Sequence, residues 1–138
     1  MLAHAWFKYN LMHGSPTIYS LYDKYDRPKF GSHGAPWKHK NTLLKIIQRR
    51  SKYGYDSLKL QKMCKEYGFF EGLLLLYLDN GYIREAIEIV IFCDYLEGFK
   101  MLMNSENFNT SNVFTWRFLF KKLIESYKND AEQLGTSF

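Results

Sequence analysis

The chain has 138 residues, a formal net charge of +5 and 46% hydrophobic residues. This apolar content is enough for a core and excludes an intrinsically disordered chain, while 9 Gly and 3 Pro exclude a collagen-like or low-complexity one. Two cysteines exclude a disulfide scaffold, and the longest apolar run, residues 73–78, is too short to cross a bilayer.

Charge is unevenly distributed along the chain. Residues 1–68 hold 13 Lys and Arg against 4 Asp and Glu, whereas residues 69–138 hold 6 against 10. This asymmetry allows an anionic partner for the first half, and it equally allows head-to-tail packing of successive units.

Helical periodicity begins at the N-terminus. The apolar residues at positions 2, 5, 6 and 9 are spaced like one face of a helix, which Gly14 would end. Ser15 and Pro16 favour the start of a second helix that runs to about residue 25. Residues 26–40 contain two Pro and two Gly and predict a loop.

The rest of the chain also has a helical period. Asp56 is a suitable N-cap, Gly54 and Gly68 are suitable helix ends, and Asn80-Gly81 predicts a turn. The remaining helices are expected at about 41–52, 56–67, 68–80, 83–93, 94–103 and 113–128. Residues 104–112 are rich in Asn, Ser and Thr and predict a loop, and the polar tail 129–138 is expected to fray.

An internal repeat occurs at an offset of 26 residues. Positions 60, 63, 64 and 67 align with positions 86, 89, 90 and 93, and both units continue with Glu-Gly at the start of a second helix. The two glycines, Gly72 and Gly98, are unfavourable in a helix, so we expect them to allow a close helix-packing seam.

The pattern predicts an all-α fold of about eight helices, arranged as stacked antiparallel helical hairpins in an α-solenoid segment. Residues 1–128 would form a single helical-repeat domain. The hairpins are 2–25, 41–67, 70–92 and 95–128, or the same helices paired one step out of phase.

Residues 58–95 resemble the clathrin-heavy-chain-type repeat, which also occurs in the α-solenoids of the vacuolar sorting subunits of the HOPS and CORVET tethers. The matching features are Met63-Cys64-Lys65-Glu66, Phe69-Phe70-Glu71, an apolar helix ending in Tyr77, a Gly-centred turn, and Arg84-Glu85-Ala86-Ile87. Nuclear-pore scaffold proteins and tetratricopeptide-like proteins carry similar patterns. The resemblance implies scaffolding in membrane traffic without catalysis.

No catalytic or cofactor motif is present in the sequence. It has no Gly-rich phosphate loop, no nucleophile elbow and no dinucleotide fingerprint. His33, His39, Cys64 and Cys93 lack the paired spacing of a structural zinc site, so we expect no metal and no cofactor.

A basic stretch with aromatic neighbours lies at residues 37–55. Cations beside aromatic rings can hold phosphates and bases, or anionic lipid head groups. The candidate residues for an anionic partner are Trp37, Lys38, Lys40, Lys45, Arg49, Arg50 and Lys52.

We therefore expect a non-catalytic helical scaffold or adaptor in a multisubunit assembly, most consistent with membrane trafficking or vesicle tethering. Its partners would be protein subunits, and it would be cytoplasmic and peripheral at an endomembrane. The aromatic candidates for the interfaces are Trp6, Tyr9, Trp116, Phe120 and Tyr127. The alternative is a nucleic-acid or ribonucleoprotein-associated helical protein, in the nucleus, that uses residues 37–55.

Overall fold

The computed structural model describes residues 2–15, 37–93, 96–109 and 113–133. Within these ranges the regular structure is entirely helical, which confirms the predicted all-α class. The helices are α1 (Leu2–Gly14), α3 (Lys40–Gln48), α4 (Arg50–Tyr53), α5 (Ser57–Tyr67), α6 (Phe70–Asp79), α7 (Ile83–Cys93), α8 (Leu96–Met103), α9 (Glu106–Asn109) and α10 (Val113–Gln133). The helix expected up to residue 25 and most of the loop expected at 26–40 lie outside the described residues.

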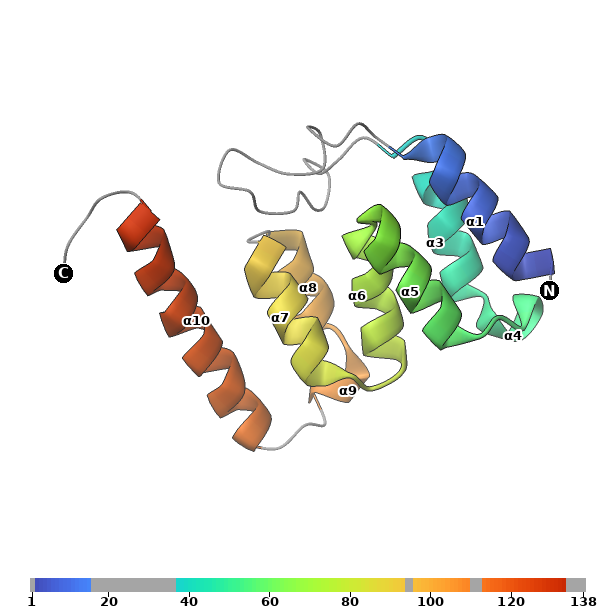
Figure 1. The fold of residues 1–138 in the computed structure, drawn as a ribbon. Helices are drawn as coiled ribbons and strands as arrows, with labels where there is room; N and C mark the ends of the chain where they lie inside the picture. Colours follow the sequence, from blue (N-terminus) through green and yellow to red (C-terminus); the bar gives the residue numbers. More distant parts are fainter. Residues whose placement is uncertain (1, 16–36, 94–95, 110–112, 134–138) are drawn as a thin grey trace.

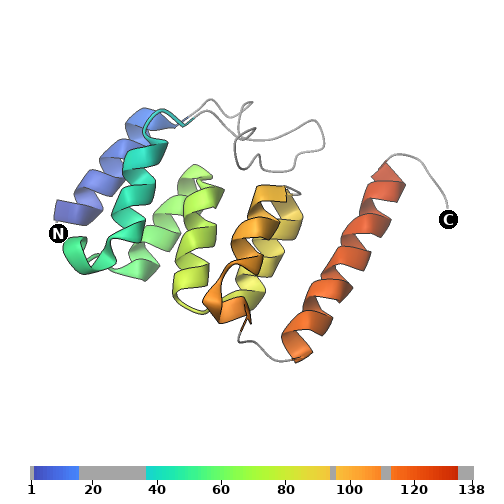
Figure 2. The same ribbon diagram turned by 180° about the vertical axis from the view of Figure 1, so that it is seen from behind.

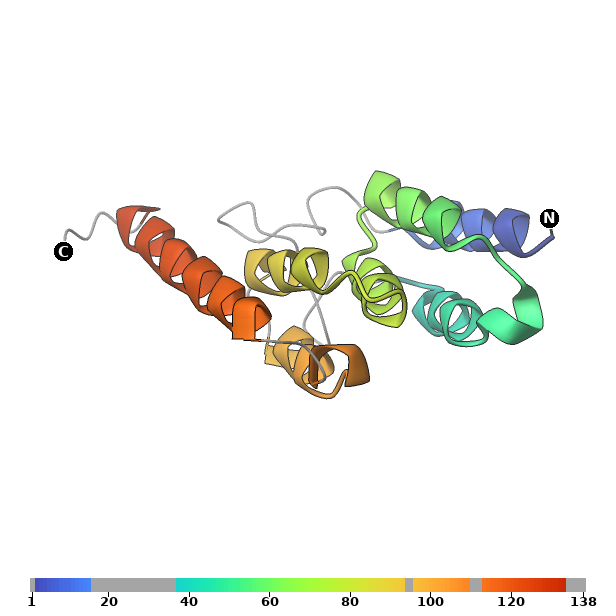
Figure 3. The same cartoon turned by 90° about the horizontal axis from the view of Figure 1, so that it is seen from below.

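The helices stack side by side in two layers. Helices α1, α5 and α7 lie in front in Figure 1, and α3, α6 and α8 lie in front when the molecule is seen from behind in Figure 2. Helix α6 contacts α3, α5, α7 and α8, and α10 packs on α7. The view from below shows the resulting row, with α1 near one end and α10 at the other (Figure 3).

The structure determines how the helices pair. Helices α5 and α6 form one antiparallel hairpin, and α7 and α8 form the next. The helices therefore pair one step out of phase with the expected hairpins 41–67 and 70–92. The repeat is also visible in burial. Leu60 and Ala86 are buried, Met63 and Ile89 are half-buried, and Cys64 and Val90 are buried again.

Local sequence signals set the ends of the central helices. The Asp56 side chain accepts a hydrogen bond from the backbone N–H of Leu58 at 3.0 Å, which caps α5 as expected. Gly68 ends α5 with a φ of 74°, in the left-handed region that glycine adopts without a steric penalty. Asn80 and Gly81 form the turn between α6 and α7.

The core runs along the row and is centred on α6. Its largest fully buried side chains are Phe7, Leu11, Leu43, Ile46, Ile47, Leu60, Phe69, Leu73, Leu74, Leu76 and Phe108. Burying one such side chain stabilises the fold by about 1.5–3 kcal/mol. Tyr55 is also buried, and its hydroxyl donates to the carbonyl of Ile47 at 2.6 Å, so its polar atom is satisfied.

Three boundaries differ from the sequence-based expectation. The helix expected at 41–52 breaks at Arg49, which separates α3 from α4. The expected loop at 104–112 contains the short helix α9, because the fully buried Phe108 anchors this segment in the core. Helix α10 continues to Gln133 instead of ending at 128.

Candidate protein-interaction faces

Helix α1 has two apolar faces, and only one of them enters the core. The buried residues are Ala3, Phe7, Asn10, Leu11 and Gly14. The opposite face carries the interface candidates Trp6, which is 44% exposed, and Tyr9, which is 58% exposed, together with Leu2 and Met12. This outward stripe is therefore available to another surface.

Ring contacts hold the aromatic residues of this stripe in place. The rings of Trp6 and Tyr53 meet edge to face with centroids 5.6 Å apart, which ties α1 to α4. The rings of Tyr9 and His13 lie 4.2 Å apart along α1. Aromatic side chains that are already oriented lose less conformational entropy when they bind.

Helix α10 presents a second exposed apolar stripe at the other end of the row. Among its described side chains only Leu119 is fully buried, where α10 packs on α7. The interface candidates Trp116, Phe120 and Tyr127 are 38%, 58% and 64% exposed. Three more apolar side chains of α10 are exposed and are not among these candidates, namely Val113, Phe114 and Ile124. Val113 and Ile124 continue the spacing of three and four residues.

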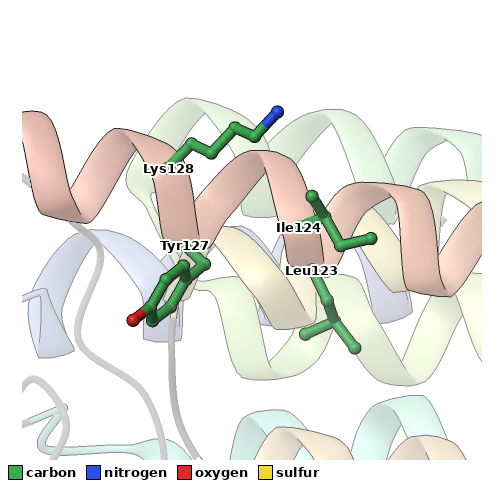
Figure 4. A pocket seen from close by; sticks show the side chains of 4 residues that line it. All are labelled: Leu123, Ile124, Tyr127 and Lys128. Atoms are coloured by element: carbon green, nitrogen blue, oxygen red, sulfur yellow. The ribbon is translucent and has the colours of Figure 1, made fainter. Parts of the chain in front are cut away.

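The stripe on α10 includes a shallow apolar hollow. It is lined by Leu123, Ile124, Tyr127 and the stem of Lys128, all from two successive turns of the helix (Figure 4). At the start of the helix the Trp116 ring packs against the ring of the buried Phe108 at 4.8 Å, so one ring of the stripe is anchored to the core.

Part of the basic stretch makes contacts within the fold. The Trp37 side chain is half-buried, with its ring 4.9 Å from the ring of the buried Phe69, and Tyr55 is 4% exposed, so Tyr55 has no free ring face for a base. The ammonium of Lys40 pairs with Glu71 at 2.8 Å.

Another basic candidate lies beside one of these rings, because the guanidinium carbon of Arg50 is 5.7 Å from the centre of the Tyr55 ring. Arg50 donates to the side-chain oxygen of Asn80 at 3.2 Å, and Lys52 lies 5.5 Å from the centre of the Tyr53 ring. Lys38, Lys45 and Arg49 are exposed. Arg50 and Lys52 therefore each lie beside an aromatic ring of the stretch, while the buried Tyr55 ring is closed to a base.

The two glycines of the repeat are both buried. A Cβ atom on Gly72 would lie 2.6 Å from the ring of Phe69 and 3.0 Å from Ile47 on α3. Since real Cβ atoms do not approach so closely, Gly72 lies where α6 passes against α3. Gly98 occupies the corresponding position on α8.

The titratable groups of the core have a structural role. Burial raises the pKa of the Cys64 thiol, which keeps it protonated and unreactive. Burial also raises the pKa of Tyr55. No three His, Cys, Asp or Glu side chains gather at a metal-binding distance among the described residues, a set that leaves out His33 and the Cys93 side chain.

The fold and its exposed stripes define a helical-repeat protein of the interaction type. A family model for the HPS5 TPR domain matches residues 1–137, so this chain belongs to the HPS5 TPR domain family. The expected class of α-solenoid repeat agrees with this family, but the match is not to the HOPS and CORVET subunits that the resemblance suggested. No curated protein and no solved structure matches the chain.

Across the described ranges, none of the helices combines the length and the apolar character that a bilayer-spanning helix requires.

Proposed function

We propose that this chain is a non-catalytic scaffold segment in a multisubunit assembly of membrane trafficking. The observation that carries the proposal is the presence of exposed aromatic stripes on both end helices, α1 and α10, of a helical-repeat fold. Helical repeats stack through apolar faces, and a terminal repeat that faces water normally has a polar outer side. Here both outer sides are apolar, which suits contacts with neighbouring subunits.

The trafficking context rests on the family. The HPS5 TPR domain is a helical-repeat domain of a vesicle-trafficking complex subunit, and this chain shares that domain over residues 1–137. A vesicle-tethering role, a cytoplasmic location and a peripheral position at an endomembrane are parts of the same proposal. Residues 1–128 would act as one unit, because helix contacts run without interruption from α1 through α6 and α7 to α10.

The proposal is tested by co-purification of the tagged chain from cells, with quantitative mass spectrometry of what it retains. We expect a reproducible set of trafficking proteins that is lost when Trp6 and Tyr9 are changed to Ser, or when Trp116 and Phe120 are. The double variant Lys45→Ser and Lys59→Ser, which changes exposed residues of α3 and α5, is the control and should keep the set. Retention of the same proteins by every variant would refute a role for the end helices.

A further inference from the structure

The outward face of α10 contains a narrow apolar row. Its members are exposed and stand three or four residues apart, and they are Val113, Trp116, Phe120, Ile124 and Tyr127. With 3.6 residues per turn, they occupy about 80° of the helix circumference. Phe114, which is 63% exposed, lies outside the row, about 100° from Val113, and the guanidinium carbon of Arg117 is 5.7 Å from the centre of its ring. A row with the width and spacing of these five residues is typical of a coiled-coil seam.

A row of charged residues runs beside the apolar one. Arg117, Lys121, Glu125 and Lys128 are exposed, and each directly follows a member of the apolar row in the sequence. Glu125 lies 3.5 Å from the ammonium of Lys122 on the same helix, so its charge is balanced within α10. The face therefore offers three cations along one side of the apolar row.

We infer that α10 docks an amphipathic helix of another protein whose apolar stripe is bordered by Asp and Glu, an inference that rests on the proposed scaffold function. The apolar side chains of that helix would pack along the row from Val113 to Tyr127, and one of them would enter the hollow beside Ile124 (Figure 4). Its carboxylates would lie against the cations, which fixes orientation and speeds association. The row is about 21 Å long, so a helix of about 15 residues covers it.

Two other occupants fit less well. A second copy would bring its own α10, with the same three cations, or its α1, whose residues 2–14 contain no Asp or Glu. The acidic residues of α10 are Glu125, which pairs with Lys122, and Asp130 and Glu132, which follow the end of the row, so a second copy supplies little negative charge along the row. An anionic membrane would supply it, but a membrane-bound helix has a broad and continuous apolar face, whereas here the cations lie between the apolar row and the exposed Phe114.

The test uses two synthetic 16-residue helices titrated into the intact 138-residue chain by fluorescence anisotropy. Both carry Leu at a spacing of three and four residues, and one is flanked by Glu while the other is flanked by Lys. We expect the Glu-flanked helix to bind at least tenfold more tightly in low salt, and its advantage to shrink as the salt concentration rises.

Charge reversal on α10 provides the decisive comparison. Changing Arg117, Lys121 and Lys128 to Glu should abolish the preference for the Glu-flanked helix. The matched variant changes three exposed lysines elsewhere, Lys45, Lys59 and Lys62, to Glu, alters the net charge equally and should keep the preference.

The apolar contribution is tested with residues of equal exposure. Phe120→Ser on α10 should weaken binding about tenfold, whereas Tyr9→Ser on α1 should leave binding unchanged. The two variants are comparable because both side chains are 58% exposed in the free chain.

Equal affinity for the two helices, or the same loss from both triple variants, would overturn the inference. So would self-association through α10 in light scattering, or binding to phosphatidylserine vesicles without binding to either helix. These outcomes leave the proposed function standing if the co-purified set still depends on Trp116 and Phe120. Loss of that dependence would count against the scaffold role itself.

Discussion

At Gly72 the backbone of α6 passes so close to its neighbours that a single added carbon would meet the Phe69 ring at 2.6 Å. Phe69 is 1% exposed and its ring also contacts Trp37, so it has little room to move away. Helix propensity alone would make Gly72→Ala stabilising by about 1 kcal/mol. The close approach predicts the opposite sign, a loss of about 1–3 kcal/mol from overpacking.

Urea unfolding of Gly72→Ala and of the parent chain shows whether the substitution lowers or raises the free energy of unfolding. Lys52→Ala, at an exposed position on α4, serves as the control and should change the unfolding free energy by less than the Gly72 variant does. Unchanged or higher stability of Gly72→Ala would show that propensity governs this position.

Asp79 illustrates how an acidic side chain can oppose folding. It is the last residue of α6, where the partial negative charge of the helix end disfavours a carboxylate. Partial desolvation of the carboxyl raises the pKa of Asp79 above its usual 3.8, and the opposing attraction of Arg50 is smaller. The residue as a whole stays exposed, so solvent screening keeps the effect on stability small. Because the folded state holds the proton more tightly than the unfolded state, ionised Asp79 lowers stability at neutral pH, and this cost disappears as the pH falls through the raised pKa.

We therefore expect Asp79→Asn to melt at a higher temperature than the parent at pH 7, with the difference vanishing toward pH 3.8. Glu88→Gln, at an exposed position on α7, removes the same charge and controls for a general effect of net charge. If Asp79→Asn melted at a lower temperature at pH 7, the attraction of Arg50 would outweigh the effect of burial.

At the scale of the element, the start of α5 depends on one side chain. The Asp56 carboxylate accepts from the N–H of Leu58, while the N–H of Asp56 itself donates to Nε2 of His4 on α1 at 2.7 Å. Asp56→Ala removes the first bond and leaves the second, so we expect a loss of about 1 kcal/mol of unfolding free energy. Asp56→Asn retains an oxygen acceptor and should lose much less. An equal loss in the two variants, measured by urea unfolding, would contradict capping as the cause.

Such local signals explain which elements could be predicted from the sequence. Asp56, Gly68 and the Asn80-Gly81 turn act through their immediate neighbours, and the helix boundaries around them agree with the structure to within two residues. The break at Arg49 and the helix around Phe108 depend on core contacts made elsewhere in the fold. Helical periodicity does not contain that information.

For the candidate faces, too, periodicity predicts one part and only packing in the fold decides the other. Periodicity predicted apolar stripes on α1 and α10, but α1 has apolar residues on both sides, and only packing shows that Phe7 enters the core while Tyr9 stays outside. The residues of the basic-aromatic stretch also divide between the core and the surface. In the fold, Trp37 and Tyr55 are drawn toward the core by their apolar rings, while Lys45 remains at the surface.

At the scale of the whole molecule, the two ends of the row differ from its middle. The central helix α6 is covered on several sides, whereas α1 and α10 each expose large apolar side chains, including Trp6 and Phe120. A monomer that presents such stripes to water attracts other apolar surfaces. We therefore expect at least one end helix to be covered by another chain, or by further residues, in the functional state.

The isolated 138-residue chain should reveal this exposure in solution. We expect it to bind a dye that reports apolar surface. Changing Tyr9 and Phe120 to Ser should reduce dye binding without lowering the melting temperature, because both side chains are 58% exposed and contribute little to the core. A monomer with a sharp melt and no dye binding would show that the stripes do not need a cover, since the chain would then be a self-sufficient domain.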